Sequence, residues 1–199
     1  KFEPLVLFDE ANSNIHLKIN TKNGALDLAD LYFQKDDSFS QKADTAGLGF
    51  VLNLSDGQRI SHVYYLPDNS YQLIQYNDYE ALSNHATEDR ISFNWNNNLK
   101  KLDQDIEYNR QFTTLNYYDA FGDFETLNSS SNKIEEVTFE TPIKWLSFNH
   151  KFFTTAVIAN GQFTSGYISS FVNPDDTLHV KNAKMLLQVP LEYYKSGEP

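Results

Sequence analysis

The sequence predicts an all-β fold, an antiparallel β-sandwich with at most one or two short helices, on three observations. Short runs of alternating apolar and polar residues recur along the chain, which is typical of strands with one face on a core. Turn-forming pairs such as Asn23-Gly24 and Asp56-Gly57 separate these runs. Aromatic residues make up 15% of the chain, with 12 Tyr and 15 Phe, and aromatic residues favour sheets.

The first half of the chain contains strand-like runs separated by turns. Strands are expected at residues 4–8, 15–19, 48–54, 60–66, 71–76 and 91–95. The last run has the clearest alternation, because Ile91, Phe93 and Trp95 alternate with polar residues. A short apolar patch at residues 28–33 precedes a charged and serine-rich stretch, residues 35–45, which is expected to be an exposed loop.

Residues 97–110 interrupt the strand pattern and leave two alternatives open. Leu99, Leu102 and Ile106 have helical spacing among interleaved charges, which favours a short surface helix. A long polar loop explains the same composition equally well.

The second half returns to strands, expected at residues 112–118, 124–127, 134–139, 163–172 and 183–194. Its most apolar stretch, residues 141–161, is expected to form the centre of the fold. Within it, residues 152–158 are apolar or β-branched on both faces, which indicates a strand covered on both sides. A helix is the competing interpretation, but neighbouring Phe, Thr and Val-Ile pairs fit a pleated sheet better.

Composition limits the domain organisation and the class of partner. No repeat or composition shift divides the 199 residues, so residues 1–199 are expected to form a single domain. The formal net charge of −11 argues against nucleic acid or an anionic membrane surface as a partner. The absence of Cys excludes disulfides, thiolate zinc sites and cysteine nucleophiles.

The residues that carry chemistry are scattered, so no catalytic, cofactor or metal site is expected and the protein is predicted not to be an enzyme. The five histidines have no metal-ligand spacing; they are His16, His62, His85, His150 and His179. The acidic pairs fall in expected loops or at strand starts, where solvated charge is the usual explanation; they are Asp36-Asp37, Asp103/Asp105, Glu135-Glu136 and Asp175-Asp176. Gly47-Leu48-Gly49 lies inside a strand pattern, where it relieves packing or marks a bulge rather than binding a nucleotide.

Several blocks resemble one protein family in order and spacing. They are PLVLFDEANSNIHLKI, DLYF, FNWNNNLKKLDQDIEYNRQFTTLNYY, IKWLSFNHKFFTTAVIA and VPLEYYKSGE. Together they are similar to the periplasmic domain of the YidC membrane protein insertases of the Bacteroidetes type. In that family a strand ending in Trp, as at Trp145, runs through a short polar turn into a Phe-Phe strand, as at Phe152 and Phe153. His150 stands at a turn position where the family usually has Gln.

The resemblance implies a β-supersandwich similar to galactose mutarotase-type proteins, facing the periplasm and tethered to the inner membrane. Family members have one or two strands before the first block and membrane helices on both sides, so the chain is expected to be an excised portion without its first strands. The resemblance also implies an accessory role beside the insertase groove, with Sec translocon components and nascent membrane proteins as partners. On this interpretation Trp145, Phe152 and Phe153 are core residues, and truncating any of them to alanine costs roughly 3–5 kcal/mol.

Two alternatives from other classes remain. A carbohydrate-binding or mutarotase-like sandwich of the aldose epimerase class would use a His and a carboxylate, or a platform of exposed Tyr, Trp and Asn side chains. A secreted or surface adhesin is the other.

Overall fold

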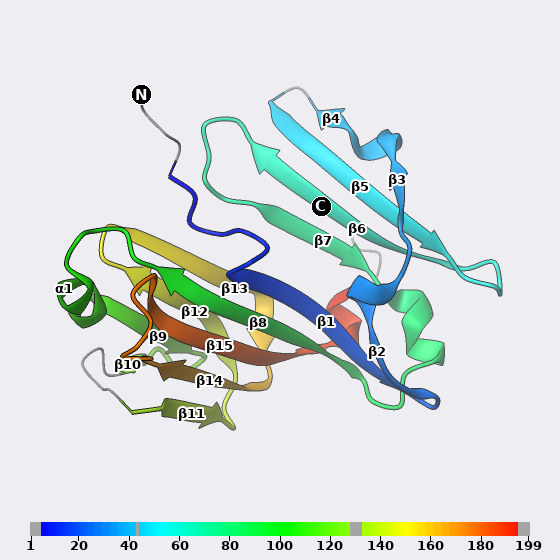
Figure 1. Cartoon of the computed structure of the whole chain (residues 1–199). Coiled ribbons are helices and arrows are strands. Elements are labelled where there is room, and N and C mark those ends of the chain that lie inside the picture. The colour runs from blue at the N-terminus through cyan, green and yellow to red at the C-terminus, as the bar shows by residue number, and fades with distance from the viewer. Residues whose placement is uncertain (1–4, 43, 128–132, 195–199) are drawn as a thin grey trace. The chain divides into compact units, whose positions relative to one another are not determined.

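The computed structural model describes residues 5–42, 44–127 and 133–194, with the side chains at positions 41 and 42 excepted. The fold is mostly β, with 58% of the described residues in strands arranged in three antiparallel sheets (Figure 1). The described residues contain one α-helix and four short 3-10 helices. The prediction of an all-β antiparallel sandwich is confirmed.

The chain divides into two compact units, each described by itself. Unit 1 comprises Lys1–Leu17 and Ser92–Val189, and unit 2 comprises Lys18–Ile91 and Pro190–Pro199. The single domain expected over residues 1–199 stays a prediction.

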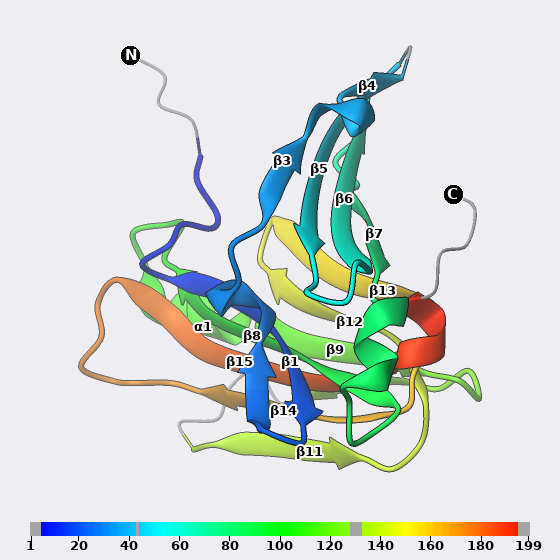
Figure 2. The same ribbon diagram turned by 90° about the vertical axis from the view of Figure 1, so that its right-hand side faces the viewer.

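Unit 1 contains two sheets, and both appear in Figure 2 as separate layers. One has the order β11-β14-β15-β8-β1-β2, its β2 end lying in unit 2, and the other has the order β10-β9-β12-β13. The elements are β1 (Ser13–Thr21), β8 (Arg90–Lys100), α1 (Ile106–Gln111), β9 (Thr113–Asp119), β10 (Phe124–Leu127), β11 (Glu135–Phe139), β12 (Ile143–His150), β13 (Phe153–Phe163), β14 (Ser165–Phe171) and β15 (His179–Pro190).

The core of unit 1 lies between these two layers, because each strand turns every second side chain inward. Trp95 of β8 and Phe148 of β12 meet across it with ring centroids 4.9 Å apart. Tyr117 of β9 and Phe139 of β11 make a second contact at 4.6 Å. Other fully buried side chains in this unit are Leu115, Ile143, Leu146, Ile168, Met185 and Leu187.

The segment after β8 settles the helix-or-loop alternatives in favour of a short helix. Asp105 caps α1 by accepting a hydrogen bond from the Tyr108 backbone N–H at 2.9 Å. Arg110, at the end of α1, is buried and donates to the carbonyls of Asn173 and Asp176 at 2.9 Å each. These bonds hold the helix against the loop that precedes β15.

Unit 2 is built around a sheet of order β3-β5-β6-β7, with β4 paired to β5. Its elements are β2 (Gly24–Asp27), η1 (Leu28–Asp30), β3 (Gln34–Asp36), η2 (Asp37–Phe39), β4 (Gln41–Lys42), β5 (Thr45–Asn53), β6 (Arg59–Pro67), β7 (Ile74–Asp78), η3 (Glu80–Asn84) and η4 (Leu191–Tyr194). Phe39 crosses β5 so closely that a Cβ on Gly49 would lie 2.3 Å from its ring. The packing role predicted for Gly47-Leu48-Gly49 is confirmed.

Several expected element boundaries are wrong. Residues 5–8 form no strand, although the Phe8 ring packs 5.7 Å from Trp95; position 4 lies outside the described residues. The expected loop at residues 35–45 contains β4, η2 and part of β3, and the charged side chains of β3 suit an edge of the sheet. The strand expected at residues 71–76 begins at Ile74, and the last strand begins at His179 rather than at Ala183.

Only the first half of the apolar stretch at residues 141–161 is central, because it forms the inner strand β12, and its buried residues differ from those expected. The strand through Trp145 continues to His150, and the turn is formed around Lys151, whose φ is +53°. β13 lies at the edge of its sheet and is largely exposed, so the expected strand covered on both sides is wrong. Phe152 is 73% exposed, Phe153 is 38% exposed and Trp145 is half-buried, so the core role expected for these three residues is wrong. The inward positions of β12 belong to Leu146 and Phe148 instead.

Candidate interaction surface

An apolar row crosses the outer face of the β10-β9-β12-β13 sheet; it consists of Phe124, Tyr118, Trp145 and Ile158 and is called the outer row below. Strand register places these side chains opposite one another, one from each strand. The rings of Tyr118 and Trp145 are stacked, with centroids 5.8 Å apart, and Phe124 lies 6.0 Å from Trp145. Phe124 is 57% exposed and Ile158 is 67% exposed, so both ends of the row face solvent.

The outer row stands out because its neighbours on the same face are small and polar. Alternation along β12 and β9 directs Leu146, Phe148 and Leu115 into the core, where all three are buried. The same alternation leaves Ser147 and Asn116, which are opposite each other in register, on the outer face, where Ser147 is only 3% exposed and Asn116 is half-buried. The row is therefore a narrow apolar strip on a polar face rather than an extension of the core.

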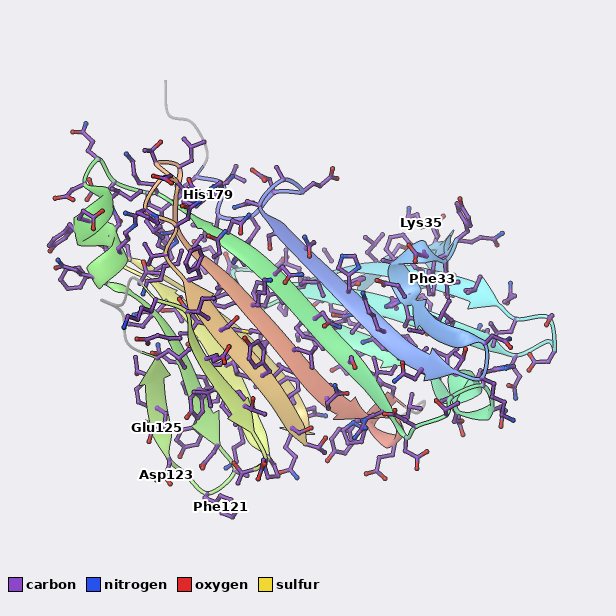
Figure 3. All side chains as sticks on the ribbon, turned by 60° about the horizontal axis from the view of Figure 1, so that its bottom comes forward. Phe33, Lys35, Phe121, Asp123, Glu125 and His179 are labelled. Atoms are coloured by element: carbon purple, nitrogen blue, oxygen red, sulfur yellow. The ribbon has the colours of Figure 1, made fainter. Side chains whose placement is uncertain are left out.

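Charged groups border this strip. The Lys144 amine lies 5.6 Å from the centre of the Tyr118 ring, within the range of a cation–π contact. At the β9–β10 hairpin, Figure 3 shows Phe121, Asp123 and Glu125 together, and the Phe121 ring is exposed. The Asp119 carboxylate accepts hydrogen bonds from backbone N–H groups of this turn. These bonds, above all the one from Asp123, lower the pKa of the carboxyl group. The rim at this end is therefore anionic.

His150 is buried at the end of β12, not in a turn as expected. Its imidazole contacts the Lys100 backbone, and burial lowers its pKa despite that hydrogen bond. Its strand neighbour Thr113 receives a 2.6 Å hydrogen bond on its carbonyl from the Lys181 amine. Burial lowers the pKa of Lys181 to about 8. The His150 imidazole therefore has a backbone group of Lys100 as its hydrogen-bond partner, whereas acid–base catalysis of the epimerase kind pairs a histidine with a carboxylate.

The acidic pairs noted in the sequence have structural partners. Asp36 caps η2, Asp105 caps α1, Asp103 forms an ion pair with Lys151, and Glu136 accepts the Tyr167 hydroxyl at 2.8 Å. Asp176 accepts the His179 backbone N–H and lies 2.9 Å from its imidazole Nδ1. His179, labelled in Figure 3, thus forms its carboxylate pair within one turn at the start of β15.

A second histidine with close partners, half-buried and not singled out by sequence reasoning, lies in unit 2. The His62 Nδ1 is 2.7 Å from the Tyr79 hydroxyl and 3.1 Å from the Asn77 Oδ1, and the Phe33 ring packs at 4.5 Å. Burial lowers the pKa of His62 and raises that of Tyr79 well above its ordinary value. These partners are neutral, so the group is a buried hydrogen-bond network that links β6 to β7 and η3.

Within the described part of the chain, no group of three or more His, Asp or Glu side chains lies close enough to hold a metal ion. A shallow hollow lined by Lys101, Leu102, Asp103 and Gln104 is open to solvent. No helix in the ranges that the structure describes has the length and apolar character needed to cross a membrane.

Fold and surface together define an antiparallel β-sandwich protein whose most prominent feature is an exposed apolar strip. No protein-family model matches the chain. Curated proteins do match it. The chain is 31% identical over 169 residues to the membrane protein insertase YidC of Amoebophilus asiaticus, and the match covers 83% of the chain and 28% of the relative. It is 26% identical over 198 residues to that of Parabacteroides distasonis, covering 96% of the chain and 29% of the relative.

The insertase YidC of Cytophaga hutchinsonii is 25% identical over 207 residues, covering 98% of the chain and 32% of the relative. The resemblance to YidC insertases of the Bacteroidetes type is thereby confirmed. The chain spans less than a third of the length of these relatives.

Proposed function

We propose that the chain is an accessory interaction domain of a YidC-type membrane protein insertase. It faces the periplasm, is tethered to the inner membrane by segments outside residues 1–199, and helps membrane proteins to insert and fold. It acts alone or with components of the Sec translocon, and its clients are nascent membrane proteins.

The observation that carries this proposal is the similarity of nearly the whole chain to less than a third of each insertase. The outer row supplies a surface of suitable chemistry, because an exposed apolar strip with a polar border is typical of an interaction site.

The relatives do not favour the carbohydrate alternative. His150 and His62 have backbone, amide and hydroxyl partners, whereas an aldose epimerase needs a histidine and a carboxylate converging on one sugar. Calorimetry against a panel of monosaccharides is therefore expected to show no heat of binding.

The complete reading frame tests the proposal most cheaply. Membrane-spanning helices are expected on both sides of this sequence, with the apolar length of ~20 residues that a bilayer requires. A reading frame without such helices would refute the proposed tether and with it the insertase role.

A further inference from the structure

β13 is an edge strand of unusual composition. Among the described residues it pairs with β12 alone, at the end of the β10-β9-β12-β13 sheet. Its eleven residues, FTTAVIANGQF, include no charged residue and no proline, in a chain of which 22% of residues are charged. The composition of this edge therefore departs from that of the chain around it.

An open edge exposes backbone N–H and C=O groups, and proteins normally protect it with charges, proline or a bulge. Here the register shifts between Ile143 and Trp145, so the irregular part of β13 lies between Ile158 and Phe163. Residues 153–158 keep a continuous register with β12. This six-residue ladder has none of the three protections along its open side.

The outer row leads to the same edge. It ends at Ile158, whose side chain faces solvent on the last strand. A strand added beside β13 would place one side chain next to Ile158, in line with Trp145 and Tyr118. The open edge and the apolar strip are therefore one continuous surface, offering backbone hydrogen bonds and apolar contact at the same place.

We propose that residues 153–158 of β13 bind an extended, uncharged peptide segment with an apolar side chain beside Ile158, by strand addition. Main-chain hydrogen bonds supply the affinity, and the apolar side chain beside Ile158 supplies the selectivity, as in other edge-strand recognition. An uncharged segment is favoured because the β13 edge offers no charged side chain that could pair with a charge on the segment. A charged side chain aligned with the outer row would also lose hydration. The inference rests on the proposed function in one respect, that the segment in the cell belongs to a membrane protein in its unfolded, extended state.

The test uses a fluorescein-labelled peptide of alternating valine and threonine, with fluorescence anisotropy and backbone hydrogen exchange as readouts. Binding is expected, with slower amide exchange in residues 153–158. An analogue of the peptide N-methylated at alternate residues should not bind, because it cannot complete the ladder. Ile158→Lys should weaken binding at least about tenfold, which corresponds to about 1.4 kcal/mol.

The matched control is Ile134→Lys, which changes a residue 63% exposed just before β11 on the other sheet of unit 1. It should leave binding unchanged, and both variants should keep the wild-type urea midpoint, since both side chains are exposed. Absence of binding, equal loss in the two variants, or binding of the N-methylated analogue would overturn the inference. None of these results affects the reading-frame test, so strand addition can fail while the insertase role stands.

Discussion

Replacing Phe148 by alanine separates the observed core from the core that the sequence alone predicts. Phe148 is 1% exposed and its ring meets Trp95 at 4.9 Å between the two layers of unit 1. A buried Phe removes about 200 Å² from water, worth about 5 kcal/mol at ~25 cal/mol per Å². Measured Phe→Ala losses are roughly 3–5 kcal/mol, so Phe148→Ala should lower the free energy of unfolding by about 4 kcal/mol.

Phe152→Ala is the matched comparison, because it makes the same chemical change four positions along the chain. With most of its ring in solvent, Phe152 retains about a quarter of that burial and a cation–π contact from Lys151 at 4.7 Å. The expected loss is about 1–2 kcal/mol, well below that of Phe148→Ala.

Urea unfolding followed by circular dichroism measures both variants, and unchanged slopes against urea would show that the midpoints can be compared. Equal losses in Phe148→Ala and Phe152→Ala, or a larger loss in Phe152→Ala, would refute the assignment of β12 as the core strand of this hairpin.

Three further predictions concern charge, packing and capping. The pKa of Lys181 is about 8 in the folded chain and about 10.5 in the unfolded chain, so the unfolded chain binds more protons between these two pH values. The free energy of unfolding should therefore rise by about 2 kcal/mol from about pH 8 to about pH 10. Urea titrations at each pH measure this rise, and Lys181→Met should remove it. Gly49→Ala should cost about 1–3 kcal/mol through the clash with Phe39, and adding Phe39→Ala should recover part of the loss; simple additivity would contradict the clash. Asp105→Ala should lower the free energy of unfolding by about 1 kcal/mol, because the Tyr108 backbone N–H at the start of α1 loses its hydrogen-bond acceptor. An unchanged thermal midpoint would contradict this capping role.

The strand pattern was predictable because alternation and turn residues are local signals. The run through Ile91, Phe93 and Trp95 became β8, and Asn23-Gly24 turns the chain with φ of +113° at Gly24. The apolar segment at residues 152–158 was misread because periodicity does not reveal a strand's place in its sheet. A strand with apolar residues on both faces can be central, or it can be an edge that leaves some of them in water, as β13 does.

The outer row was not predictable from the sequence. Tyr118, Phe124, Trp145 and Ile158 come from four different strands, and only the antiparallel register aligns them. One local signal existed, since Trp145 and Leu146 are adjacent apolar residues in a strand and must face opposite sides. The burial of His150 was also hidden, because it depends on Lys100 and Thr113 from other strands.

Site-specific photo-crosslinking in membranes tests the central claim most directly. A photoreactive residue would replace Ile158 or, as the control, Ile134, in cells that express the chain within its complete reading frame. Crosslinks from position 158 to newly made membrane proteins, absent from position 134, are the predicted result. Equal crosslinking from the two positions, or none from position 158 while membrane proteins are being inserted, would contradict the proposal that the β13 edge and the outer row form the interaction surface.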